Sequence, residues 1–196
     1  SKVLFSTLSE TGYLGEKMSN NRAHFGQNSL FVGVSETKGE CTSVVTFSLA
    51  TLPQDAIITD AKVSLYPINR VSATIEKYGE WNVGILENET LEDIYSFESV
   101  KEANVLQYVG RPTRSQHLTQ GIWRDWKFSH LECKLLEKQL QHEKVHFRVD
   151  GPTDLIEGRN SQMMEWDLGY GKYGYGLGFR PKLEIAYTIQ IGRAHV

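Results

Sequence analysis

The chain has 196 residues, of which 40% are hydrophobic, and a formal net charge of −3 at pH 7. This composition favours one globular domain with a sizeable core and excludes a chain that is disordered as a whole. The weak negative charge provides no basic face for nucleic acid, and no apolar run approaches the roughly 20 residues that span a bilayer.

Short segments with strand-like alternation recur along the chain and are separated by turn signals, which predicts an all-β fold. The first strands are expected at 3–7, 29–34 and 43–49, and Pro53 then turns the chain toward the longest candidate, 57–68. Further strands are expected at 81–86, 105–109, 122–128, 145–149, 163–168 and 183–189.

Two capping-box patterns predict short helices between these strands, at 99–102 (Ser-Val-Lys-Glu) and at 129–132 (Ser-His-Leu-Glu). The second helix is the better one, because leucines recur at helical spacing, and we expect it to cover one end of the sandwich. These leucines are Leu131, Leu135, Leu136 and Leu140.

This pattern of elements predicts an antiparallel β-sandwich, jelly-roll-like, with one or two short helices and a single domain over residues 1–190. The last six residues, 191–196, break the strand pattern. Their sequence Ile-Gly-Arg-Ala-His-Val is similar to a translated sequencing adapter, as in a read from environmental DNA. We expect a non-native or disordered tail, and the alternative is a short native extension.

The segment from His142 to His146 fits the zinc-protease pattern H-E-x-x-H, which needs both histidines on one helical face. The alternation of Val145, Phe147 and Val149 predicts a strand instead, in which the two histidines would lie roughly 13 Å apart. No Ser-His-Asp arrangement with a supporting turn is present. We therefore expect no catalysis, no bound metal and no cofactor.

The two cysteines, Cys41 and Cys133, match no metal-ligand spacing. They form one disulfide in an oxidising compartment, or they remain two free thiols.

The most unusual segment is 169–178, where glycines alternate with tyrosines. No helix follows it, so it does not resemble a phosphate-binding loop. Such a loop can present aromatic faces on which sugar rings stack. Trp123 and Trp126 are three residues apart and face opposite sides of a strand, so at most one of them is in the core. The candidate ligand-binding residues are Tyr170, Tyr173, Tyr175, Trp166, Trp123 and Trp126, and the alternative for each tryptophan is core packing.

Several stretches together form a recognisable pattern: 30–33 (Leu-Phe-Val-Gly), 45–49 (Val-Thr-Phe-Ser-Leu), Leu52-Pro53, 56–66 and 180–187 (Arg-Pro-Lys-Leu-Glu-Ile-Ala-Tyr). This pattern resembles the DNRLRE-domain family, also called disaggregatase-related modules. The family's T-W-x-x-x-P stretch is replaced here by 94–99. The resemblance implies a β-sandwich of secreted or surface proteins. Such modules act as carbohydrate-binding modules of polysaccharide-active enzymes, or belong to cell-envelope, spore-surface and phage structural proteins.

We therefore expect a non-catalytic module, extracellular or at the cell surface, that binds a polysaccharide or cell-surface glycan. The alternative is a structural subunit or domain of a surface appendage, spore coat or phage tail, which self-associates through edge strands. The apolar N-terminal stretch 2–8 either pairs within its own domain or is donated to a neighbour.

Overall fold

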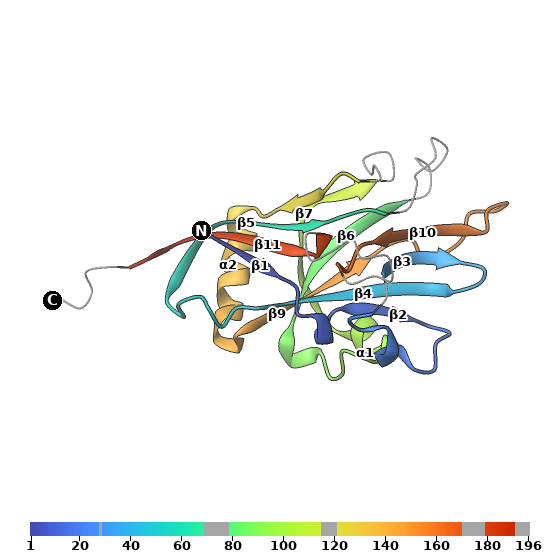
Figure 1. Ribbon diagram of the computed structural model, residues 1–196, viewed down its shortest axis with the longest axis horizontal. Helices are drawn as coiled ribbons and strands as arrows, with labels where there is room; N and C mark the ends of the chain where they lie inside the picture. Colours follow the sequence, from blue (N-terminus) through green and yellow to red (C-terminus); the bar gives the residue numbers. More distant parts are fainter. Residues whose placement is uncertain (28, 69–78, 115–120, 170–178, 191–196) are drawn as a thin grey trace.

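The structure is a computed structural model that describes residues 1–27, 29–68, 79–114, 121–169 and 179–190. Its strands form two antiparallel sheets, of four and seven strands, which pack face to face (Figure 1). The all-β sandwich expected from the spacing of strands and turns is therefore confirmed.

The smaller sheet contains both the first and the last strand of the chain. Its order is β1 (Lys2–Phe5), β11 (Lys182–Ile189), β5 (Ala56–Leu65) and β8 (Arg124–Lys127). In the β1–β11 pair Val3 lies opposite Glu184, so the N-terminal stretch pairs within its own domain. Strands β1 and β8 are the two edges of this sheet.

The larger sheet includes one strand that the alternation did not predict. The order is β10 (Ser161–Trp166), β3 (Leu30–Ser35), β4 (Gly39–Ser48), β9 (Lys144–Asp150), β6 (Glu80–Leu86) and β7 (Val105–Arg114), with β2 (Gly12–Gly15) also paired to β4. The unpredicted strand is β2. All four of its residues are buried, so no polar and apolar alternation marks it.

One core fills the space between the two sheets. Alternate side chains of both sheets point into it, such as Val45 and Phe47 from β4 and Val63 from β5. Both sheets thus contribute side chains to the same core. The largest fully buried side chains are Trp81, Trp126, Trp166, Phe47 and Phe147.

Helix α2 (His130–Lys138) begins with the predicted capping box. The hydroxyl of Ser129 accepts the Glu132 N–H, and the Glu132 carboxylate accepts the Ser129 N–H, both at 3.2 Å. The helix leads from β8 in the smaller sheet toward β9 in the larger one and covers one end of the sandwich, as expected (Figure 1). Cys133 and Leu136 enter the core, whereas Leu131 is 64% exposed, so its predicted place on the apolar face is wrong.

Helix α1 (Phe97–Glu102) begins three residues earlier than the sequence predicted. Its N-cap is Ser96, whose hydroxyl accepts the Ser99 N–H at 3.2 Å. Ser99 instead lies inside the helix, and its hydroxyl accepts the Asp93 N–H. Both serines suit an N-cap, and only the path of the preceding chain selects one. Short 3-10 turns complete the fold, at Leu8–Glu10, Asn21–His24, Asn88–Thr90 and Gln139–His142.

Strand β7 continues past its predicted end at residue 109 because of a bulge. Gly110 has a φ of +64°, which a glycine adopts without strain, and the pairing with β6 shifts register there. The N–H of Gly110 donates to the Glu132 carboxylate at 2.7 Å. Pro112 follows, and a proline is tolerated because β7 is an edge strand.

Candidate functional site

Two of the tryptophans predicted to bind ligand lie in the core. Trp126 is 1% exposed and Trp166 is 0% exposed. Alternate residues of β8 and β10 face inward, and both tryptophans occupy inward-facing positions. A sugar ring cannot reach a buried indole. Trp126 and Trp166 are therefore core residues and not the ligand-binding residues that we predicted.

The third tryptophan predicted to bind ligand, Trp123, lies at the surface and is half-buried. It is on the face of the smaller sheet that points away from the core. It thus faces the side opposite to Trp126, as the three-residue spacing predicts. Its ring meets Tyr66 edge-on, with centroids 5.3 Å apart. The Nζ of Lys182 lies 4.4 Å from the indole centroid, which is a cation–π contact.

The predicted tyrosines Tyr170, Tyr173 and Tyr175 lie outside the described residues, but both ends of their segment are described. At one end the Asp167 N–H donates to the Tyr66 carbonyl at 2.8 Å. At the other end Phe179 stacks on the Tyr66 ring, with centroids 4.2 Å apart. Asp167 and Phe179, at the two ends of this segment, therefore both lie beside Tyr66, next to Trp123. We call Tyr66, Trp123 and Phe179 the aromatic platform.

Charged side chains lie beside the aromatic platform on the same outer face. The Nζ of Lys62 lies 3.5 Å from Asp125 and 3.3 Å from Glu184, and the hydrogen bond with Glu184 raises the pKa of this lysine. The Ser64 hydroxyl donates to Asp125 at 2.5 Å. These contacts hold carboxylates and an ammonium in fixed positions across three strands, where they can bond to hydroxyl groups of a ligand.

A groove of about 630 Å³ crosses this face from one edge of the sheet to the other. Its volume falls within the range of about 300–1,000 Å³ found for ligand pockets. The small side chain of Ala186, which lies opposite Asp60, leaves room at its middle. Its lining comes from all four strands or their immediate neighbours and includes Lys2, Val3, Asp60, Lys62, Lys127, Phe128, Glu184 and Ile185.

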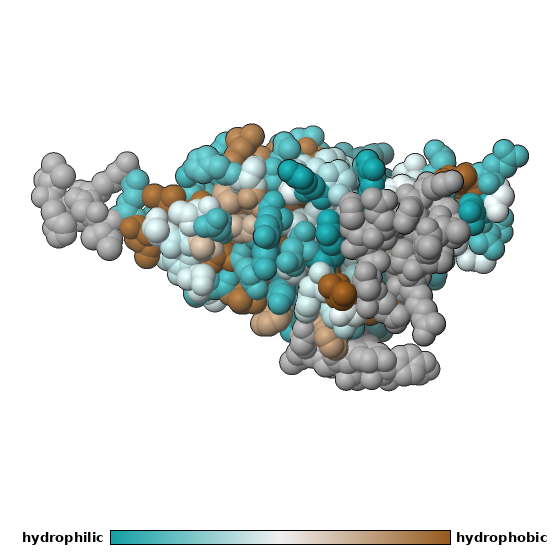
Figure 2. Space-filling model, turned by 90° about the horizontal axis from the view of Figure 1, so that it is seen from above, coloured by the Kyte–Doolittle hydropathy of each residue, from teal (hydrophilic) through white to brown (hydrophobic). Residues whose placement is uncertain are grey.

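The surface of the molecule is mixed rather than uniformly apolar on the face that Figure 2 displays. Hydrophilic side chains run across the middle of that face, and hydrophobic ones lie singly or in small groups.

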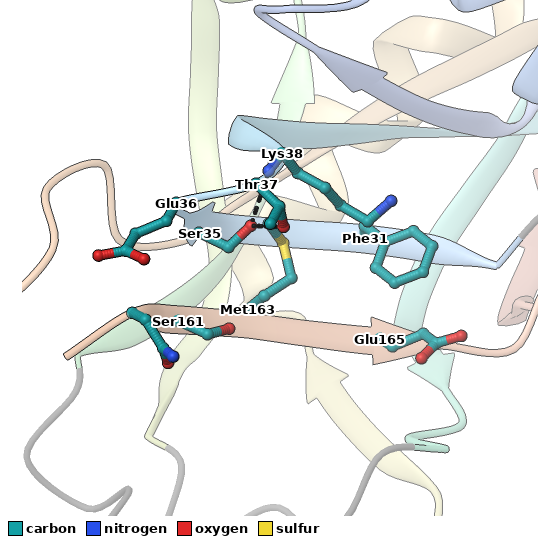
Figure 3. A pocket seen from close by; sticks show the side chains of 9 residues that line it. Phe31, Ser35, Glu36, Thr37, Lys38, Ser161, Met163 and Glu165 are labelled. Atoms are coloured by element: carbon teal, nitrogen blue, oxygen red, sulfur yellow. Dashed lines mark hydrogen bonds between the residues drawn. The ribbon is translucent and has the colours of Figure 1, made fainter.

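A second hollow, of about 340 Å³, lies on the outer face of the larger sheet, over β3 and β10. Phe31 and Glu165 flank one end, Glu36 and Ser161 the other, and Met163 lies between them (Figure 3). The Lys38 Nζ lies 4.6 Å from the centroid of the Phe31 ring. This cation–π contact resembles the one between Lys182 and Trp123.

The zinc-protease pattern does not form a site. His142 ends a 3-10 turn and its Nε2 lies 3.2 Å from Glu89, while His146 is on β9 and its Nδ1 lies 2.7 Å from the Thr46 hydroxyl. A left-handed residue, Glu143, separates the turn from the strand. The strand predicted from the alternation of Val145, Phe147 and Val149 is confirmed, whereas His142 lies before it, in the turn.

Both cysteines are free and buried. Burial raises the pKa of the Cys41 thiol to about 11 and also raises that of Cys133. A thiol with a raised pKa is a weak nucleophile, so neither cysteine suits catalysis.

Within the described ranges, no three His, Cys, Asp or Glu side chains gather closely enough to hold a metal ion. The same residues include no helix that is both long and apolar enough to cross a membrane.

No model of a known protein family matches the chain, and no curated protein matches it either. What this site can bind is therefore inferred from its geometry.

Sequence reasoning did not single out Tyr66 and Lys182 as site residues. The alternation in the last strand could have indicated the orientation of Lys182. Leu183 and Ile185 are core residues, so Lys182 lies on the outer face. Nothing in the sequence indicates that Lys182 stands over Trp123, since β5 lies between their strands.

Proposed function

We propose that this protein is a non-catalytic, extracellular or cell-surface module that binds a polysaccharide on the outer face of its smaller sheet. The observation that carries this proposal is the position of Trp123. Its half-exposed indole lies beside Tyr66, at the point where the glycine- and tyrosine-rich segment joins the fold, and next to a groove with fixed charges.

This combination fits the chemistry of sugar recognition. Aromatic rings provide flat apolar faces for the C–H groups of a sugar, and carboxylates and ammonium groups bond to its hydroxyls. A groove lined by all four strands of a sheet is also long enough to suit an extended polymer. The resemblance to DNRLRE-domain modules supports the same proposal from the sequence.

The direct test is a retardation gel in which soluble polysaccharides are cast, followed by a glycan array. We expect retardation by at least one polysaccharide, and we expect Trp123→Ala to weaken binding about tenfold or more, or 1.4 kcal/mol. Phe31→Ala is the matched control, because it removes a half-exposed aromatic ring from the opposite sheet. If a range of neutral and acidic glycans all fail to bind, the proposal is wrong.

The second candidate is a structural subunit or domain of a surface appendage, spore coat or phage tail. The edge strand β1 favours it, because Val3 and Phe5 on this strand are 51% and 49% exposed. A subunit of this kind forms open assemblies that grow with concentration. Light scattering after size-exclusion chromatography would detect such growth, and a fixed small oligomer would contradict it.

A further inference from the structure

The β-sheet edges of this protein differ in how they are protected against pairing with other chains. Exposed edges are normally blocked by charges, prolines, bulges or covering segments. Strand β7 carries Pro112, a bulge at Gly110 and the charged residues Arg111 and Arg114. Strand β8 lies against β7, where the backbone of Lys127 approaches Gly110 closely.

Two further strands with an outer side are covered by the chain itself. The Ile68 N–H donates to the Glu165 carbonyl at 3.1 Å, so residues 66–68 pair along one end of β10. Strand β2 is flanked by the turn Asn21–His24, and the Asn21 side chain accepts the Gly15 N–H at 2.9 Å.

Strand β1 has no comparable protection within the described part of the chain. The Ser6 N–H donates toward β11, to Pro181, whereas the Thr7 N–H donates to the opposite side, to Thr46. Backbone groups alternate along a strand, so the N–H and C=O groups of Val3 and Phe5 point outward. The one charged side chain of β1 is Lys2, and its ammonium bonds to the Thr51 carbonyl at 3.0 Å.

We propose that the protein forms a twofold dimer in which β1 pairs antiparallel with β1 of a second copy. A second copy fits because the edge is complementary to itself. With Leu4 on the axis, Val3 of each copy lies opposite Phe5 of the other. The outward N–H and C=O groups of these two residues then form four hydrogen bonds between the copies. Aliphatic–aromatic pairs of this kind are favourable cross-strand neighbours.

The dimer has a consequence for ligand binding. A twofold axis between antiparallel strands is perpendicular to the sheet, so the two four-stranded sheets join into one and both aromatic platforms face the same side. Seven inter-strand steps of about 4.8 Å place the two copies of β8 about 34 Å apart. One polysaccharide chain then contacts both platforms; this bivalent part rests on the proposed function, whereas the dimer itself does not.

The closed symmetry also distinguishes this assembly from a filament. In an isologous interface both copies bury the same edge, so no free β1 edge remains for a third copy. Specific interfaces usually bury about 1,200–2,000 Å², and a four-residue edge is smaller, so we expect a dissociation constant of about 10–100 μM.

Sedimentation velocity over about 10 μM to 1 mM protein tests the dimer in the range where it should form. Two double variants test the register. Val3→Glu with Phe5→Glu places like charges opposite each other, and Val3→Lys with Phe5→Glu places opposite charges there. We expect the first variant to be a monomer and the second a dimer, with similar thermal unfolding. A wild-type monomer over the whole range, or identical behaviour of the two variants, would overturn the dimer.

Cysteine cross-linking provides a check that does not depend on charge. Leu4→Cys places two thiols at a non-hydrogen-bonded pair, where Cα atoms lie about 4.5 Å apart and a disulfide can form. We expect oxidation to yield a covalent dimer, and Val3→Cys, whose thiols lie diagonally across the axis, to yield far less. Equal cross-linking of both variants would refute the register.

Binding to a polysaccharide found in the retardation gel separates the two proposals. We expect the oxidised Leu4→Cys dimer to bind at least about tenfold more tightly than the reduced variant at protein concentrations below about 1 μM, because only the former is bivalent there and Leu4 does not line the groove. A dimer that binds no glycan refutes the proposed function and leaves the dimer standing. Equal binding by the oxidised and reduced forms refutes the bivalent part.

Discussion

His146 makes the stability of this protein depend on pH in a defined window. The side chain is 6% exposed, on β9, and its Nδ1 lies 2.7 Å from the Thr46 hydroxyl. That hydroxyl donates its proton to the Glu10 carbonyl at 2.7 Å, so it must accept from the imidazole, which is neutral with its proton on Nδ1. Burial lowers the pKa of His146 from 6.5 to about 4.

The free energy of unfolding depends on pH because the folded and unfolded forms bind a proton at this histidine at different pH values. Between about pH 6.5 and pH 4 the unfolded chain protonates this histidine and the folded protein does not, so the free energy of unfolding falls as pH falls. The two pKa values give a loss of about 2 kcal/mol between about pH 7.5 and pH 5, and about 3 kcal/mol by about pH 4. Above about pH 7.5 this contribution is fully present and constant.

Urea unfolding followed by tryptophan fluorescence at several pH values measures this loss. The matched variant is His146→Asn, whose amide N–H can still donate to Thr46 but does not titrate. The variant can be less stable at every pH, so the comparison is between the two slopes. We expect wild type to lose about 2 kcal/mol more than the variant between about pH 7.5 and pH 5. Parallel curves would refute the reasoning.

Other predictions concern single contacts, each measured by chemical denaturation. Trp126→Ala should cost about 3–5 kcal/mol because it empties a core position, whereas Trp123→Ala should cost clearly less, and equal costs would contradict the assignment of the two faces. Arg148→Met should cost about 3 kcal/mol, because this buried guanidinium bonds to Asp150 and to the carbonyl groups at the end of α1, and a cost near zero would contradict that role. Ser129→Ala should cost about 1 kcal/mol through loss of the α2 cap, and Ser129→Thr should retain most of the stability.

The positions of most strands could be predicted from the sequence because strand alternation is a local property. Val45, Phe47 and Leu49 alternate with polar residues, and this marks both the strand and its inward face. The capping box at Ser129 is local in the same way, since all of its hydrogen bonds join residues three apart. Strand β2 was missed because both of its faces are covered, which removes the alternation.

The site was only partly predictable because its contacts join distant residues. The sequence placed Trp123 and Trp126 on opposite faces of a strand, with at most one of them in the core, and marked the glycine- and tyrosine-rich segment as unusual. It did not indicate that Tyr66 and Phe179 stack, or that Lys182 stands over Trp123, because these pairs come from strands β5, β8 and β11 or their ends.

The sequence by itself determined the strand class, the two short helices and the opposite orientations of Trp123 and Trp126, because backbone geometry fixes a two-residue period in any strand. Only the tertiary structure decided that Trp126 and Trp166 are the buried ones and that Trp123 belongs to a surface platform. Which face of a strand is inside depends on the sheet that covers it, and that sheet is assembled from segments far apart in the chain.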